Sequence, residues 1–266
     1  MEALVAYLAL TVPTFIMVVS RAIGLFMQAP VLSNRNLPAP VRMSLIAGIS
    51  LVAMTQMPAT AALPQQLLGF VIVAMTELAL GFILGYSANI MFLAIQSAGE
   101  LGGVQAGLSS ASVQNPFTKT NVNAMGTFYF NIAILIFMVF GGHLWLIGGF
   151  VQSFALVPIG GFVLSPAVGA QVILASGAFL AITIQLALPM VTVVFVAELG
   201  VGYMSKVAQQ ASSLTQDLVT IAKPVSGLIL LLLLLPNLMS MTHQYAEQNM
   251  KDMHRFLQVA GENSKR

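Results

Sequence analysis

The chain has 266 residues, of which 58% are hydrophobic and 7% are charged, whereas water-soluble globular domains carry about 25% charged residues. From Thr120 to Ala197 there is no Asp, Glu, Lys or Arg, and a water-soluble domain could not cover its surface with such a segment. The apolar content excludes disorder, the absence of cysteine excludes a disulfide scaffold, and a net charge of +2 gives no reason to expect nucleic-acid binding. The composition therefore predicts an integral membrane protein.

Six apolar segments follow one another along the chain, and each reaches the roughly 20 residues that cross a bilayer as an α-helix. They are Ala3–Ala29, Met43–Leu63, Leu67–Ser97, Ala124–Leu156, Ala167–Tyr203 and Val219–Met241. We expect helices because lipid offers no water to unpaired backbone groups, and because Leu228–Leu235 does not alternate as a barrel strand would. The third and fifth segments exceed the bilayer thickness, and Pro13 and Pro189 are expected kink points. The predicted fold is all-α: a multi-helix integral membrane protein with long, kinked helices.

Two parts of the chain differ from these segments. The link from Gly107 to Asn123 is too polar to span a membrane and has no clear helical or strand periodicity. After Met241 the chain becomes polar, and apolar residues recur there at helical spacing opposite charged ones. The apolar positions are Ala246, Met250, Met253, Leu257 and Ala260, and the charged ones are Glu247, Lys251, Asp252 and Arg255. This pattern predicts an amphipathic helix in the tail.

The basic residues give conflicting signals about orientation in the membrane. Arg35, Arg42, Lys119, Lys206 and Lys223 fall in odd-numbered links, which the positive-inside tendency places in the cytoplasm. Six full spans would then put the basic C-terminal tail outside. A re-entrant pair of helices would resolve the conflict, and so would a protein whose apolar faces are covered mainly by other subunits.

Three glutamates, Glu77, Glu100 and Glu198, lie within or at the edge of apolar segments. A charge at mid-membrane costs about 2.5–3.5 kcal/mol on insertion scales, so it usually faces protein or water. These residues could form a proton or ion relay, but more often such a group pairs with a base, here Arg21, or with a polar group of a neighbouring subunit. The relay leads to an alternative function, a secondary transporter that uses Glu77 or Glu100 as a coupling site, although no internal repeat pairs broken helices around them.

Catalysis has little support in the sequence. Ser109, Ser110 or Ser112 with His143 could suggest an intramembrane serine protease, but no G-x-S-x-G surrounds the serines, and a single histidine after two glycines is more often structural. No histidine and carboxylate have metal-ligand spacing, and no phosphate-binding loop is present. We therefore expect a protein that is not an enzyme and that uses no cofactor or metal.

Glycines recur at four-residue spacing at Gly81 and Gly85, and again at Gly99 and Gly103. Such spacing produces a flat helix face that lets another backbone approach closely. The pattern fits packing against another subunit and packing within the chain equally well.

Several blocks of the sequence resemble the FliR/SctT family, the export-gate membrane components of the flagellar and virulence type III secretion systems. The blocks are RAIGLFMQAP from Arg21, PAPVR ending at Arg42, ELALGFILGYSANIMFLAIQSAGELGGVQAGLS from Glu77, NP at 115–116, GGH at 141–143, SFALVP from Ser153 and LALP ending at Pro189. Their order and spacing carry the resemblance, which weakens after Gly202. The GGH element favours the flagellar branch.

The resemblance implies a non-enzymatic subunit of a type III protein export gate in the bacterial cytoplasmic (inner) membrane, at the flagellar basal body. It implies FliP and FliQ homologues as partners in a closed pore for unfolded export substrates, a docked FlhB homologue, and no nucleic acid. Residues 1–166 would form a FliP-like helical part, residues 167–242 a FliQ-like helical hairpin, and residues 243–266 the amphipathic C-terminal tail.

The resemblance also implies roles for single residues. A loop at about residues 104–122 would plug the pore, although a simple surface link is the alternative. The candidate plug residues are Gln105, Gly107, Ser109, Ser110, Ser112, Asn115, Pro116 and Lys119. The candidate buried or structural charges are Arg21, Arg42, Glu77, Glu100 and His143. The candidate helix-packing residues are Gly81, Gly85, Gly99 and Gly103.

Overall fold

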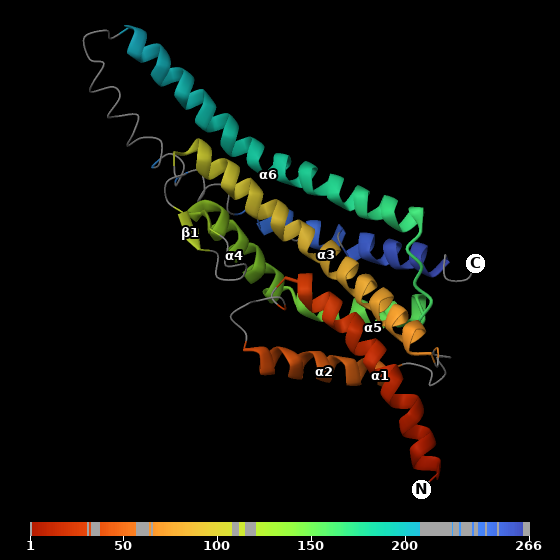
Figure 1. The fold of residues 1–266 in the computed structure, drawn as a ribbon. Helices are drawn as coiled ribbons and strands as arrows, with labels where there is room; N and C mark the ends of the chain where they lie inside the picture. Colours follow the sequence, from red (N-terminus) through yellow and green to blue (C-terminus); the bar gives the residue numbers. More distant parts are fainter. Residues whose placement is uncertain are drawn as a thin grey trace. The chain divides into compact units, whose positions relative to one another are not determined.

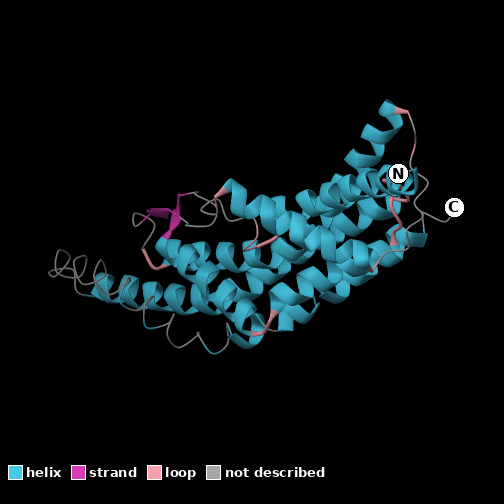
Figure 2. Cartoon of the chain, turned by 90° about the horizontal axis from the view of Figure 1, so that it is seen from below, coloured by secondary structure: helices cyan, strands magenta, loops and turns pink. Residues whose placement is uncertain are grey.

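In the residues that it describes, the computed structural model of the chain consists of helices, two short strands and their connections (Figures 1 and 2). It describes residues 2–30, 32, 38–56, 64, 66–107, 112–114, 121–207, 225, 229, 236, 239–242, 244–248 and 250–262. The elements are α1 (Glu2–Gln28), α2 (Ala39–Thr55), α3 (Leu67–Gln105), β1 (Ser112–Gln114), β2 (Asn121–Asn123), α4 (Ala124–Val139), α5 (Gly142–Leu156) and α6 (Pro166–Val207). Residues 244–248 and 250–262 are also helical. The all-α prediction is confirmed.

The two longest helices exceed the thickness of a bilayer, as expected. Helix α3 has 39 residues and α6 has 42, which at 1.5 Å per residue corresponds to roughly 58 and 63 Å, against a hydrocarbon core of about 30 Å. Helix α3 stops shortly before Gly107, whose φ of +73° is the left-handed conformation that commonly ends a helix. Pro13 lies inside α1 and Pro189 inside α6, and both helices continue through these residues.

The prediction that the second apolar segment reaches spanning length is wrong for the helix observed. Helix α2 has 17 residues, with Pro38 as its N-cap and a further proline in its first turn, where a missing N–H costs nothing. It ends at Thr55, and residues 57–63 of the predicted segment lie outside the described residues. Gln56 and Pro58 follow this end, and a proline at such a position commonly marks the end of a helix, but hydropathy averaged over the whole segment does not register it.

The fourth segment, predicted as one span, contains two helices. Helix α4 ends at Val139 and α5 begins at Gly142, because Gly141 between them has a φ of +71° that no α-helix accommodates. Within the described residues, three helices are long and apolar enough to cross a membrane: Thr11–Gln28 of α1, α3, and Pro166–Gly200 of α6. The broken pair α4 and α5 would make a fourth. Most of the sixth predicted segment lies outside the described residues.

The chain divides into two compact units. The first contains Met1–Ile90, Gly141–Ser176 and Ala246–Arg266. In its core α1 packs on α2, and buried side chains come from α1, α3, α5 and the helix at 250–262. Among them are Met17, Val18, Leu80, Leu84, Phe150 and Leu257. In the helix at 250–262, Met253, Leu257 and Ala260 are buried and Lys251 and Arg255 are exposed, as the sequence pattern predicts, whereas Met250 of the predicted apolar face is exposed.

The second unit contains Met91–Phe140 and Gly177–Tyr245. Its core includes Phe92 of α3, whose ring meets Phe130 and Phe137 of α4 edge to face, with centroids 6.3 and 5.2 Å apart. The Thr183 hydroxyl of α6 donates a hydrogen bond to the Ala94 carbonyl of α3 at 3.3 Å. These contacts hold α4 and α6 of this unit to the C-terminal part of α3.

Strands β1 and β2 pair antiparallel, with Ser112 opposite Asn123 and Gln114 opposite Asn121. The sequence showed no strand periodicity in this link, because three residues are too few for an alternating pattern to stand out. The pair lies between the end of α3 and the start of α4 in the chain.

Candidate functional site

Helices α1 and α3 approach each other closely through three glycines. A Cβ added at Gly81 would overlap the backbone carbonyl of Arg21, and one at Gly24 would overlap the backbone of α3. One turn further on, a Cβ at Gly85 would lie 2.6 Å from the Leu25 carbonyl oxygen. Any larger residue would push the helices apart, so the glycines set the distance between the two backbones. The predicted packing residues Gly81 and Gly85 therefore pack within the chain, and Gly24 is a partner that the spacing did not indicate.

This close crossing places Arg21 of α1 against Glu77 of α3. The Arg21 Nε donates to Glu77 Oε2 at 2.6 Å, and both side chains are completely inaccessible to solvent. The second carboxylate oxygen, Oε1, accepts a hydrogen bond from the backbone N–H of Gly160 at 2.9 Å. Gly160 has a φ of +77°, so the turn that aims this N–H at the glutamate suits glycine.

Helix α5 and the residue that follows it complete the surroundings of the guanidinium. Nη1 of Arg21 donates to the Ser153 hydroxyl and Nη2 to the Val157 carbonyl, each at 3.0 Å. The Phe154 ring lies below the guanidinium, with its centroid 4.0 Å from the central carbon. The Arg21 guanidinium thus donates to a carboxylate of α3 and to a hydroxyl and a carbonyl at the end of α5, and it packs on an aromatic ring of α5.

The chemistry of this cluster is structural. The free-energy cost of removing an ion pair from water is offset only where further hydrogen bonds satisfy both groups. Such bonds are present around Arg21 and Glu77. The secondary-transporter alternative is not supported, because Glu77 is bound by Arg21 and Gly160, and the Glu100 carboxylate accepts from Gln96 Nε2 at 2.9 Å. The cluster ties α1, α3 and the end of α5 together.

Three blocks that were separate in the sequence meet at this point. The first begins with Arg21 and the second with Glu77, and SFALVP supplies Ser153, Phe154 and Val157. The sequence marked the two charges but gave no role to the α5 residues. Their signal was present in the resemblance, but nothing local links a serine to an arginine 132 positions earlier.

A second cluster lies in the other unit, where α3 ends and α4 begins. The side-chain amide of Asn123 donates through Nδ2 to the backbone carbonyl of Glu100 at 2.7 Å. Its Oδ1 accepts from the backbone N–H of Gly126 at 2.7 Å, which makes Asn123 the N-cap of α4. One side chain therefore connects β2, α3 and α4.

Glycines again allow this contact. A Cβ at Gly99 would lie 2.9 Å from the Met125 carbonyl oxygen, and one at Gly103 would lie 2.7 Å from Asn123 Nδ2. On the facing helix, a Cβ at Gly126 would overlap the Glu100 side chain. Gly99 and Gly103 thus also pack within the chain.

The candidate plug residues are described in part. Gln105 and Gly107 are exposed at the end of α3, and Ser112 begins β1. Ser109, Ser110, Asn115, Pro116 and Lys119 lie outside the described residues.

The remaining candidates lie apart from both clusters. Arg42, expected as a buried or structural charge, is half-buried in the first turns of α2. His143 is half-buried at the start of α5, and its buried Nδ1 has no hydrogen-bond partner in the part of the chain that is described. Among the same residues, no group of three His, Asp or Glu side chains could hold a metal ion.

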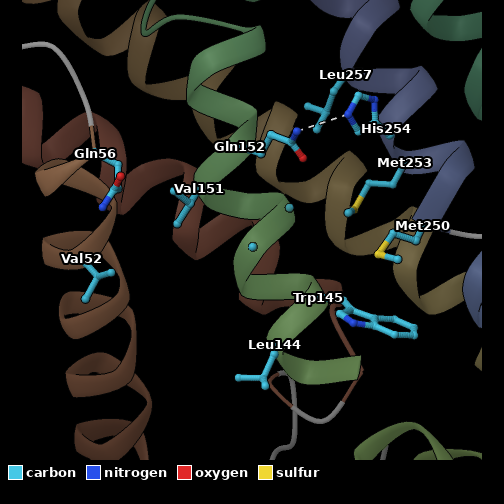
Figure 3. Close-up of a pocket in the computed structure, with 12 residues that line it drawn as sticks. Val52, Gln56, Leu144, Trp145, Val151, Gln152, Met250, Met253, His254 and Leu257 are labelled. Atoms are coloured by element: carbon cyan, nitrogen blue, oxygen red, sulfur yellow. Dashed lines mark hydrogen bonds between the residues drawn. The ribbon is translucent and has the colours of Figure 1, made fainter. Parts of the chain in front are cut away.

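A groove of about 600 Å³ lies between α2, α5 and the tail helix of the first unit (Figure 3). Its lining is mostly apolar and includes Val52, Trp145, Met253 and Leu257. At its edge Gln152 Nε2 and His254 Nε2 are 3.3 Å apart, the contact that the dashed line marks (Figure 3). No candidate site residue lines this groove.

The sequence profile of the family described as "Bacterial export proteins, family 1" matches residues 12–249. The chain belongs to this family. It is 32% identical to the flagellar biosynthetic protein FliR of Escherichia coli (strain K12) over 202 residues, which cover 72% of this chain and 73% of that protein. It is 30% identical to FliR of Pectobacterium carotovorum subsp. carotovorum, over 81% of this chain and 83% of that protein.

A relative outside the FliR proteins is the Yop proteins translocation protein T of Yersinia pestis, at 30% identity over 62% of each chain. These matches confirm the resemblance to the FliR/SctT family and favour its flagellar branch. Both clusters, around Arg21 and around Asn123, lie within the residues that match the bacterial export proteins.

Proposed function

We propose that the chain is a non-enzymatic subunit of the type III protein export gate that serves flagellar assembly. The family match carries the proposal, because residues 12–249 match the bacterial export proteins and the relatives include proteins named flagellar biosynthetic protein FliR. The second kind of relative, a Yop translocation protein, comes from a system that also moves proteins. The family description names export, and the name of the Yop relative names the translocation of proteins.

In this proposal the chain forms a closed pore for unfolded substrates together with FliP and FliQ homologues, and an FlhB homologue docks on it. The assembly sits in the bacterial inner membrane at the flagellar basal body. Residues 1–166 are its FliP-like part, residues 167–242 its FliQ-like hairpin and residues 243–266 its tail. Support comes from large apolar side chains that the chain leaves uncovered, such as Leu67 and Leu68 of α3 at 80% and 73% exposure and Ile173 of α6 at 73%. Such surfaces need lipid or partner helices to cover them.

The proposal also assigns residues 104–122 as the plug of this pore. The assignment is supported by the way the structure holds the two ends of this segment. On one side α3 ends before Gly107, and on the other Asn123 caps α4 and binds the end of α3. A segment held at its base in this way can be displaced while the helices around it stay packed.

Partner dependence is the first test. Expressed alone, the chain should aggregate or be degraded, and co-expression with FliP-like and FliQ-like proteins should restore a complex whose mass includes all three. In a strain that lacks its own copy, the chain should restore swimming on soft agar. A long-lived, monodisperse monomer in mild detergent that never binds these partners would contradict the proposal.

The plug is tested by shortening the segment Ser109 to Thr120. The complex should still assemble, because the α3–α4 contacts remain, but cells that produce it should leak ions. Conductance across a planar bilayer and growth in high salt measure the leak. A shortened complex as tight as the original would show that these residues form a surface link.

A further inference from the structure

The groove between α2, α5 and the tail helix is lined for a hydrocarbon ligand. The residues that line it include no Asp, Glu, Lys or Arg, and its polar members are Gln56, Gln152 and His254. Gly148 leaves open space above α5, since a Cβ added there would meet nothing within 4 Å. A charged group placed in such a groove would lose its hydration without gaining a partner, so the lining selects an uncharged, apolar occupant.

The size of the groove limits what this occupant can be. One turn of an α-helix with its side chains, about 10–12 Å across and 5.4 Å long, fills roughly 400–600 Å³. The groove of about 600 Å³ therefore holds about one turn, which is too little to seat a partner helix. Volumes of about 300–1,000 Å³ are instead typical of sites for small molecules. The small apolar molecules that surround a helical membrane protein are lipids, and a flexible acyl chain one carbon wide fits a narrow groove.

Hydrogen-bond donors and a positive charge lie at one edge of the groove. Gln152 Nε2 and His254 Nε2 are 3.3 Å apart there (Figure 3), and Lys251, one helical turn before His254, is exposed. The amide of Gln152 has two N–H donors, of which the contact with His254 uses at most one. The acidic Glu247 lies a further turn away along the tail, beyond Lys251. An ammonium group and N–H donors bind phosphate, so this edge complements the charge of a phospholipid headgroup.

We propose that the groove binds one membrane phospholipid, with an acyl chain across Gly148 and the phosphate at Lys251 and His254. The chain then contacts α2, α5 and the tail helix together, with Val52 on one side and Met253 on the other. A ligand that binds only the folded arrangement stabilises it, so the lipid holds the tail helix on α5. This site lies outside both polar clusters and does not depend on the place of the chain in an export gate.

Trp145 reports directly on an occupant, because it lines the groove and is the only tryptophan of the chain. The full chain in mild detergent is titrated with a phosphatidylglycerol whose acyl chains carry bromine atoms, which quench a tryptophan that they touch. Quenching should saturate at about one lipid per chain. Quenching that rises with lipid and never saturates would show only general contact with the micelle, and it would overturn the proposal.

Filling the groove should abolish the saturable quenching. Gly148→Leu places a side chain in the open space above α5. Gly169→Leu is the matched control, because it makes the same change on α6 of the same unit, also with nothing within 4 Å, at a residue that does not line the groove. The control should bind the brominated lipid as the original chain does. Saturable quenching that survives in Gly148→Leu would overturn the proposal.

The position of the phosphate is tested on the tail helix. Lys251→Ala should weaken binding about two- to fivefold, the range of an exposed ion pair. Arg255→Ala removes the same charge from an exposed position of the same helix, where the guanidinium lies 3.8 Å from Asp252, and should leave the affinity unchanged. A brominated diacylglycerol, which has no phosphate, should bind both variants equally. Equal affinities of Lys251→Ala and Arg255→Ala for the phospholipid would contradict the assigned headgroup position.

A second measurement needs no substitution and decides the matter if Gly148→Leu does not fold. A phospholipid with a photoreactive diazirine in its acyl chain is added to the original chain and illuminated. It should label peptides with Val52 and Leu144 of the groove more than those with Ile173 and Leu174, which are at least as exposed on α6. Excess unlabelled phospholipid should remove this difference. Equal labelling of the two sets without competitor would overturn the proposal.

Discussion

Arg21 and Glu77 lie 56 positions apart in the chain, and their side chains form a 2.6 Å ion pair that solvent does not reach. The pair depends on Gly81, which lets α3 approach the backbone of Arg21 without a side chain in between. Helix α5 then contributes Ser153 and Phe154 to the same guanidinium. Three helices of the first unit are therefore fixed by one polar cluster inside an apolar core.

Removing one member of the pair should be more harmful than removing both. Arg21→Met or Glu77→Leu alone leaves an uncompensated buried charge, which typically costs about 3–5 kcal/mol of unfolding free energy. The double substitution should recover part of this loss, although the Val157 carbonyl and the Gly160 N–H lose the partners that Arg21 and Glu77 provide. Thermal unfolding in detergent measures the series, with Arg42→Met, at a half-buried position of α2, as the near-neutral control. A double variant as unstable as the sum of the two single variants would contradict this expectation.

Two glycine-to-alanine substitutions should change the stability of the protein in opposite directions. Gly81→Ala places a methyl group on the Arg21 carbonyl, and such overpacking costs about 1–3 kcal/mol. Gly48→Ala, in α2 with nothing within 4 Å of the new carbon, should stabilise by about 0.5–1 kcal/mol because alanine loses less backbone entropy in a helix. Melting temperatures in the same detergent compare the two. If Gly81→Ala is as stable as Gly48→Ala, the α1–α3 crossing is looser than described.

A single methyl group added at Gly261 should loosen the contact between the tail helix and the end of α5. A Cβ at Gly261 would overlap the backbone carbonyl of Leu156, which cannot move aside as a flexible side chain could. Gly261→Ala should therefore loosen residues 250–262 and speed tryptic cleavage after the exposed Lys251 and Arg255. Gly148→Ala, on α5 with open space above it, should leave the digestion unchanged. Equal cleavage rates in the two variants would show that the contact does not hold the tail.

Truncation of the Phe92 side chain should destabilise the core of the second unit. Its ring contacts Phe130 and Phe137, and Phe92→Ala would leave a cavity that typically costs about 3–5 kcal/mol. Phe128, on the same helix as both partners, is 41% exposed, so Phe128→Ala should cost clearly less. Unfolding monitored in detergent distinguishes them, and a loss of equal size in both variants would argue against this core.

Local patterns in the sequence were enough for much of the fold. Hydropathy over windows of about 20 residues predicted the membrane class and the unusual length of α3 and α6. The prediction was possible because a helix that crosses lipid is a continuous apolar stretch of sequence. The tail helix was predicted for the same reason, since Met253, Leu257 and Ala260 recur at helical spacing. The early end of α2 and the break at Gly141 were missed, because averaging hydropathy over about 20 residues hides short signals such as Pro58 and the glycine pair at 141–142.

The sequence by itself determined that the chain is a helical membrane protein, which residues are charged within its apolar segments, and where its glycines are spaced by one turn. The tertiary structure alone decided that Glu77 is paired with Arg21, that Ser153 and Val157 complete that pair, and that the glycines face helices of the same chain. It also decided that Asn123 binds α3 as well as capping α4. The reason is physical: composition and period are properties of neighbouring residues, whereas these contacts depend on how closely and at which turn two distant helices cross.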